Sequence, residues 1–197
     1  NGLRLMGEGG RALPTPAIES ELWQRLADYK IGPTDAAFTF AQRLARENRW
    51  SADYAERVVI EYKRFCWLAC EAGHEVTPSD AVDQAWHLHL TYSRDYWDRF
   101  CPHVLQMPLH HGPTAGGTAE RSRYYDQYAQ TLASYEAHFG EPAPLDIWPD
   151  AKRRFLVDPL SVRVNPADAV ILPRGQAYGV ATAIGLALAA LLLAAIW

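Results

Sequence analysis

The last 23 residues of the sequence contain no charged side chain, and this run constrains the fold more than any other feature. It reads GQAYGVATAIGLALAALLLAAIW, over residues 175–197. As an α-helix, the part from Tyr178 onward would extend about 30 Å, which is the thickness of the hydrocarbon core of a bilayer. Tyr178 and Trp197 stand near its two ends, where aromatic rings favour the membrane interface. We therefore expect residues 175–197 to form a single transmembrane helix that anchors the chain in membrane lipid.

The basic residues near this run all precede it, and none follows it. They are Lys152, Arg153, Arg154, Arg163 and Arg174. Because positive charge beside a membrane helix favours the cytoplasmic side, we expect the preceding domain to be cytoplasmic. The three cysteines are too few for a disulfide framework, which also fits a reducing compartment.

Small residues recur every four positions on one face of the expected membrane helix, at Ala181, Gly185 and Ala189. Such spacing allows a second helix to approach closely, so this face can dock on another transmembrane subunit. The alternative is an Ala- and Leu-rich anchor whose small residues have no partner. The run has no ionisable side chain, so it offers no proton relay and no histidine ligand for haem or chlorophyll.

The rest of the chain shows helical periodicity and no sustained alternation of the kind that marks strands. We predict a mainly α fold, an irregular bundle of about five helices. The chain divides into an extended arm, a helical soluble domain, a Pro-rich connector and the membrane helix, over residues 1–14, 15–140, 141–174 and 175–197. Start and stop signals place the helices near residues 15–31, 34–47, 51–72, 77–100 and 118–139, the fourth ending at Cys101-Pro102.

The connector carries prolines that forbid a long helix. They are Pro142, Pro144, Pro149, Pro159, Pro166 and Pro173. A short strand at Ser161–Val164 is the one regular element expected there. The apolar residues of the connector predict that it packs on the domain or on a partner. We expect partner proteins to contact both this connector and the N-terminal arm.

The charge balance and the motifs exclude several classes of protein. A net charge of −4 argues against nucleic acid as a partner. The sequence contains no nucleophile elbow, no phosphate-binding Gly loop and no dinucleotide fingerprint. We therefore expect a protein that is not an enzyme of these classes, and more generally a non-catalytic one.

Potential metal ligands cluster in one part of the chain. They are Asp83, His87, His89, Cys101, His103, His110 and His111. Residues two apart on an α-helix point about 200° from each other, so His87 and His89 cannot bind one ion from a regular helix. A helical wheel places His87 on the polar face with Asp83, and His89 on the apolar face.

Two interpretations remain for these residues. In the first, Asp83 and His87 form an i, i+4 pair that stabilises the helix surface, and His89 is buried and bonded to a carbonyl or a tyrosine hydroxyl. In the second, a metal site forms from His89, His110, His111 and Cys101. Such nitrogen and sulfur ligands would favour zinc.

The residues Asp83, Trp86, His87, His89, Tyr96 and Cys101, followed by Leu109-His110-His111-x-Pro113, occur in a recognisable order. In this order the chain resembles the glycine-rich domain-containing protein family of bacteria and plants. The resemblance covers residues 35–140. It implies a helical protein with no established reaction, so no catalytic residue follows from it.

These features together predict a non-catalytic accessory or structural subunit of a larger membrane protein complex. A photosynthetic or respiratory complex is one kind of host. The alternative is a membrane-tethered metal-binding protein or metalloenzyme that uses the histidine and cysteine cluster. A third class is a cytoplasmic adaptor that recruits a soluble protein through an aromatic surface.

Overall fold

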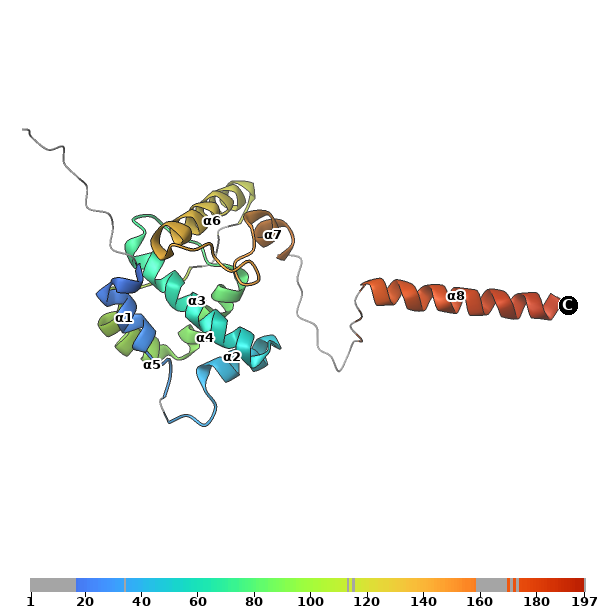
Figure 1. The fold of residues 1–197 in the computed structure, drawn as a ribbon, viewed down its shortest axis with the longest axis horizontal. Coiled ribbons are helices and arrows are strands. Elements are labelled where there is room, and N and C mark those ends of the chain that lie inside the picture. The colour runs from blue at the N-terminus through green and yellow to red at the C-terminus, as the bar shows by residue number, and fades with distance from the viewer. Residues whose placement is uncertain are drawn as a thin grey trace, which may run out of the picture. The chain divides into compact units, whose positions relative to one another are not determined.

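The computed structural model describes residues 17–33, 35–112, 114, 116–158, 170, 172 and 174–196. Over these ranges the chain is helical and has no strand, which confirms the prediction of a mainly α fold (Figure 1). The α-helices are α1 (Glu21–Asp28), α2 (Phe40–Asn48), α3 (Ala52–Glu71), α4 (Asp80–Thr91), α5 (Ser93–Asp95), α6 (Thr118–Phe139), α7 (Ala151–Leu156) and α8 (Arg174–Ile196). A 3-10 turn, η1 (Ala17–Glu19), precedes α1, and a π-helix, η2 (Tyr96–Leu105), follows α5. The chain forms two compact units, residues 1–160 and 161–197.

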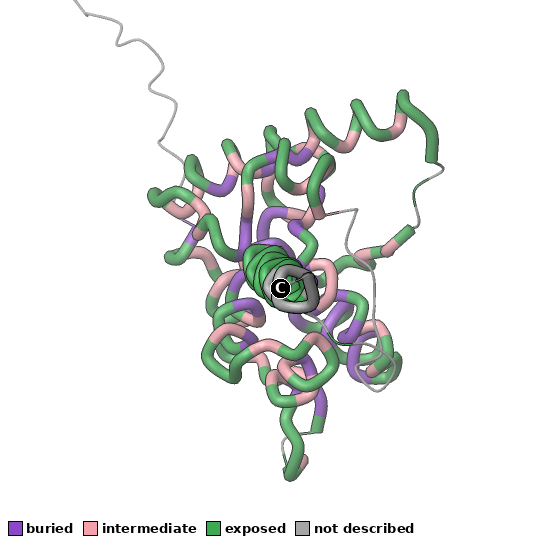
Figure 2. The backbone as a smooth tube through the Cα atoms, turned by 90° about the vertical axis from the view of Figure 1, so that its right-hand side faces the viewer, coloured by how far each residue is buried: buried purple, intermediate pink, exposed green. Residues whose placement is uncertain are grey.

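Helix α3 is the centre of the first unit and contacts α1, α2, α4 and α6. It begins at Ser51, whose hydroxyl accepts a hydrogen bond from the Tyr54 backbone N–H, as the sequence predicts. One side of α3 is buried and contributes Val58, Tyr62 and Phe65 to the core. Figure 2 shows the buried segments of the unit in purple among its exposed segments. Burial of apolar and aromatic side chains on α3 therefore holds the bundle together.

Three helices begin later than the sequence analysis predicts. Helix α1 starts at Glu21 and not near residue 15, because the Ser20 hydroxyl accepts a hydrogen bond from the Trp23 backbone N–H. Helix α2 starts at Phe40 instead of Thr34, because Thr39 and Gln42 form a reciprocal capping box. Helix α4 starts after Ser79, whose hydroxyl accepts a hydrogen bond from the Val82 backbone N–H. In each case the hydroxyl that caps the helix lies closer to the first apolar residue of the helix than the hydroxyl predicted to cap it.

The predicted helix over residues 77–100 is divided in two, and the prediction that it ends at Cys101-Pro102 is wrong. Helix α4 ends at Thr91, and Tyr92 leaves helical geometry with φ −84° and ψ 53°. The π-helix η2 then continues through Pro102 and ends at Gln106, which has a φ of 61°. In an α-helix proline loses a hydrogen bond and clashes with the carbonyl four residues earlier. The wider π turn bonds residues five apart and accommodates the ring.

The segment after α6 packs on the domain and carries a helix that was not predicted. Helix α6 ends at Phe139 with Gly140 in the left-handed region (φ 73°), in agreement with the sequence analysis. Trp148 is buried and its indole N–H donates to the Glu61 carboxylate at 2.9 Å. Asp150 then caps the short helix α7. The expected arm at residues 1–14 and the expected strand at Ser161–Val164 lie outside the described residues.

In the second unit, α8 covers most of the uncharged C-terminal run. Its described apolar side chains are exposed, among them Ile184 and Leu188. Within the described residues, no helix combines the length and the apolar character needed to cross a bilayer. Trp197, the expected interface residue at the far end, lies outside the described residues.

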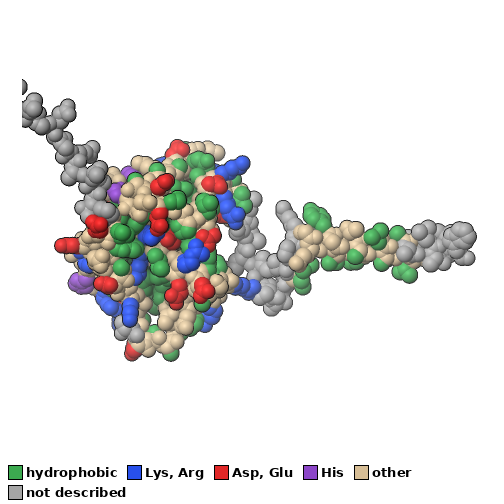
Figure 3. Space-filling model, in the orientation of Figure 1, with side chains coloured by type: hydrophobic (Ala, Val, Ile, Leu, Met, Phe, Trp, Pro, Cys, Tyr) green, Lys and Arg blue, Asp and Glu red, His purple; other side chains and the backbone are tan. Residues whose placement is uncertain are grey.

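Charged side chains of both signs are mixed on the face of the first unit that Figure 3 shows. Ion pairs within this unit include Arg57 with Asp146 at 2.7 Å and Arg64 with Glu141 at 2.8 Å. Both of these pairs join α3 to the segment that follows α6. Arg57 and Asp146 are both about half exposed, so their pair adds at most about 1 kcal/mol to the packing of that segment. Arg64 is only 19% exposed, whereas its partner Glu141 is exposed.

Candidate metal centre

Helix α4 presents Asp83 and His87 one turn apart on the same face. The side chain of His87 is 53% exposed and that of Asp83 is 20% exposed. His89, two residues further along, is fully buried. The opposite placement of His87 and His89 confirms what the helical wheel predicts, since residues two apart face different sides of a helix.

His111 approaches these two residues from the segment that follows η2. The indole N–H of Trp86 donates to the Tyr96 hydroxyl at 2.9 Å, and this hydroxyl donates to the Leu109 carbonyl. The Trp86 ring also lies 4.5 Å from the His111 ring, edge to face. The π-helix therefore holds Tyr96 where it can fix residues 109–111 against α4.

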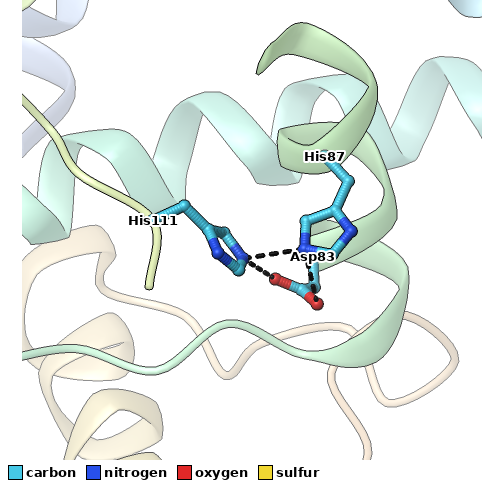
Figure 4. Close-up of side chains that lie close together, drawn as sticks. All are labelled: Asp83, His87 and His111. Carbon is cyan, nitrogen blue, oxygen red and sulfur yellow. Dashed lines mark hydrogen bonds and ion pairs between the residues drawn. The ribbon is translucent and has the colours of Figure 1, made fainter. Parts of the chain in front are cut away.

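Asp83, His87 and His111 direct donor atoms at one another (Figure 4). The Nε2 atom of His111 lies 2.9 Å from Asp83 Oδ1 and 2.9 Å from His87 Nε2. His87 Nε2 lies 3.8 Å from Asp83 Oδ2. Among the residues that the structure describes, this is the one group of three or more His, Cys, Asp or Glu donors within 4.8 Å of one another.

A single proton on His111 Nε2 can serve both contacts when both imidazoles are neutral. A neutral imidazole nitrogen either donates or accepts a hydrogen bond. If His111 Nε2 donates, its N–H is shared between Asp83 Oδ1 and the Nε2 lone pair of His87, so the two hydrogen bonds cannot both be straight. A cation between the three residues would instead accept a lone pair from each of them.

The separations also suit a small transition-metal ion. In a tetrahedral zinc site with bonds of about 2.0–2.1 Å, neighbouring donors lie about 3.3 Å apart. The shortest distances between the three residues, from 2.9 to 3.8 Å, bracket this value. Two imidazoles and one carboxylate leave at least one coordination position open, which is typical of catalytic sites and not of structural ones.

The three residues lie on the wall of a cleft of about 690 Å³. Its apolar lining comes from Phe65, Trp86, Leu109, Tyr124 and Phe155. Its charged lining comes from Glu75, Asp83, Arg123 and Arg154. A small molecule in the cleft could therefore reach an ion held by the three donors, since the cleft has the size of many small-molecule sites.

Of the four ligands predicted from the sequence, only His111 belongs to this group. His89 bonds to the Tyr62 hydroxyl at 3.0 Å and to Asp95 at 3.1 Å, which is the buried arrangement considered as its alternative. Burial lowers the pKa of His89, and the hydrogen bond to Asp95 opposes this effect. Cys101 is buried in η2, where burial raises the pKa of its thiol. His110 is exposed and lies against the Trp97 ring at 5.2 Å.

The sequence analysis includes Asp83 and His87 among the potential metal ligands but assigns them to an i, i+4 pair and not to the predicted metal site. An acid and a histidine at this spacing project the same way from a helix, so they can bind one ion as well as each other. The signal for the centre was therefore present in α4. What the sequence did not reveal is that His111 joins this pair and not His89.

A family model matches the part of the chain that contains the candidate centre. Residues 36–127, which are 92 of the 197 residues, match a family model described as UCP032817-like. This finding overturns the expected resemblance to glycine-rich domain-containing proteins, because the family that matches is a different one. The three donor residues all lie within the matched segment. No curated protein and no solved structure matches the chain.

Proposed function

We propose that this chain is a metalloprotein that binds one zinc ion through Asp83, His87 and His111. The observation that carries the proposal is the convergence of three donor groups at 2.9–3.8 Å, with Asp83 and His87 both directed at the Nε2 atom of His111. Trp86 and Tyr96 support the centre from behind by fixing the segment that carries His111. Such outer contacts orient ligands in known metal sites.

Zinc is the ion that the donor set favours, because imidazole nitrogen and carboxylate oxygen both bind it at tetrahedral distances. The same set of two histidines and one carboxylate also binds ferrous iron in some oxygenases. In either case the ion would act as a Lewis acid at the open position facing the cleft, where it would polarise a bound oxygen atom.

Elemental analysis with matched variants tests the proposal. The full chain is stripped of metal, reloaded with zinc chloride, dialysed and analysed for bound metal. We expect about one zinc per chain, and at least a hundredfold weaker binding after His111→Ala, because the loss of a ligand leaves only two donors. His110→Ala is the matched control, since it removes the neighbouring imidazole on the same cleft wall and should leave zinc affinity unchanged. Less than about a tenth of an ion per reloaded chain would refute the proposal.

We propose a second function for the C-terminal unit, in which α8 attaches the protein to a larger membrane complex as an accessory subunit. The uncharged run at residues 175–197 and the exposed apolar side chains of α8 support it, because such a surface favours lipid or another helix. In this proposal the first unit lies on the cytoplasmic side, and the face with Ala181, Gly185 and Ala189 meets a partner helix. A photosynthetic or respiratory complex is a suitable host.

Purification from native membranes in mild detergent tests the second function. We expect other subunits to co-purify, and Gly185→Leu to weaken their association. Ala187→Leu is the control, because position 187 points about 200° away from position 185 on a helix. Recovery of the chain as a monomer without other subunits would contradict the attachment.

A further inference from the structure

Arg154 lies on the wall of the same cleft, and the oxygen atoms nearest to its guanidinium group are distant. It projects from α7, and its side chain is only 16% exposed. Its Nε atom lies 3.4 Å from the Pro78 carbonyl, and a terminal nitrogen lies 3.8 Å from Asp80. Charge-assisted hydrogen bonds of guanidinium groups are normally about 2.7–2.9 Å long. Within the described chain, Arg154 therefore makes no short hydrogen bond and has donors to offer to a ligand.

The other arginine of the cleft differs in this respect. Arg123 donates to both carboxylate oxygens of Glu120 at 3.0 and 3.1 Å, and to Glu75 at 3.3 Å. These carboxylates compete with any ligand for its donors. Arg154 is therefore the cation on this wall that best fits an incoming anion.

The charge of the cleft points the same way. The carboxylates of Glu75 and Asp83 cancel the two guanidinium groups on its lining. A divalent ion at the candidate centre adds positive charge that no lining side chain offsets. An anion in the cleft would then be attracted by the ion and by Arg154 at once, and the partly buried setting strengthens both attractions.

The remaining lining specifies the rest of the ligand. Tyr124, Leu109 and Phe155 supply partly exposed apolar surface, and the buried rings of Phe65 and Trp86 lie at the base of this wall. We propose that the cleft binds a small organic carboxylate, whose carboxylate pairs with Arg154 and whose apolar body packs on this wall. A planar carboxylate matches the guanidinium fork in two parallel hydrogen bonds. The inference rests on the proposed zinc centre for the net positive charge of the site.

Calorimetric titration of the zinc-loaded full chain with phenylacetate tests the inference, with phenylacetamide as the uncharged ligand of the same shape. We expect phenylacetate to bind at least about tenfold more tightly than the amide, and Arg154→Gln to weaken phenylacetate by a similar factor. Arg153→Gln is the matched control on the same helix. Its side chain is 66% exposed and pairs with Asp158 at 3.6 Å, so its loss should change the affinity less than twofold.

Zinc content measured on the same samples separates this inference from the proposed function. If zinc is bound but phenylacetate binds Arg154→Gln as well as the wild type, or does not bind at all, the carboxylate site is wrong and the metal centre stands. If no sample holds zinc, the metal proposal fails, and binding of phenylacetate that depends on Arg154 would still support the carboxylate site. Arg154→Lys keeps the charge without the fork and should lie between the wild type and Arg154→Gln. It also serves as the test if Arg154→Gln fails to fold.

Discussion

Asp95 is the most connected buried carboxylate in the described structure, and its removal gives the sharpest test of the fold. It is 8% exposed and accepts hydrogen bonds from the Tyr29 hydroxyl at 2.9 Å and the Gly32 backbone N–H at 3.1 Å. It also pairs with His89 at 3.1 Å and Arg99 at 2.9 Å. One side chain thus joins the segment after α1 to the end of α4 and the start of η2.

The cost of Asp95→Ala follows from what each partner loses. The Gly32 N–H and the buried Nε2 atom of His89 would be left without a hydrogen bond, at about 1–3 kcal/mol each. Tyr29 and Arg99 can turn toward water, so their loss adds no more than about 1 kcal/mol in total. We expect the free energy of unfolding to fall by about 2–7 kcal/mol, which corresponds to a drop in Tm of about 5–25 °C for a domain of this size.

Urea unfolding followed by far-ultraviolet circular dichroism measures this change. Asp98→Ala is the control, because Asp98 is exposed on the same stretch of helix, and it should change stability by less than about 0.5 kcal/mol. Asp95→Asn should fall between the two, since its amide keeps an acceptor but presents a donor toward His89 or Gly32. A loss below about 1 kcal/mol for Asp95→Ala, with an unchanged dependence on urea, would show that Asp95 does not hold these segments together.

Two further changes test other parts of the packing. Burial raises the pKa of Glu61 above its ordinary value. This carboxyl therefore stabilises the fold below its unfolded pKa, and that contribution is lost as the pH rises through its folded pKa. In urea unfolding, the stability of Glu61→Gln relative to the wild type should rise between pH 4 and pH 8, and a fall would show that the fold favours the charged carboxylate. Gly32 has a φ of +81°, and an added Cβ would lie 3.0 Å from Tyr92 Cε1. We expect Gly32→Ala to lower the free energy of unfolding by at least about 1 kcal/mol, measured by thermal unfolding. An unchanged Tm would contradict the tight contact with Tyr92.

The helices that the sequence predicts well are those with strong local signals at their ends. Ser51 caps α3 and Gly140 closes α6, and neither depends on distant contacts. Thr39 and Gln42 have the spacing of a capping box and so also mark the start of α2, although the sequence analysis places that start at Thr34. Local chemistry therefore accounts for most of the helix boundaries.

The π-helix and α7 could not be read in the same way. The apolar pattern of α4 continues through residues 92–100, so the sequence gives no sign that the helix breaks at Tyr92. This break coincides with contacts that Asp95 makes to Tyr29 and Gly32, more than sixty positions earlier. Helix α7 has only six residues and follows several prolines, so no periodicity marks it. Its position depends on contacts with α6.

The candidate site also has one part that the sequence predicts locally and one that depends on distant contacts. The spacing of Asp83 and His87 belongs to one helix and can be recognised from the sequence. The arrival of His111 depends on the chain of hydrogen bonds from Trp86 through Tyr96 to the Leu109 carbonyl. A contact between positions 24 residues apart has no local sequence signal. The sequence analysis therefore groups His111 with His89, whereas the structure places it beside Asp83 and His87.

The short helix α7 also determines how a mechanical pull from the C-terminal side would enter the fold. Along the chain, tension on the residues after 158 reaches α7 before it reaches the buried Trp148 and its bond to Glu61. Helix α7 is held through its contacts with α6, including Phe155 against Tyr128 at 5.8 Å, so these contacts would bear the tension before Trp148 does. Because α7 carries Arg154, a taut tail would withdraw a charged wall of the cleft while the three donors on α4 and its neighbouring loop stay in place.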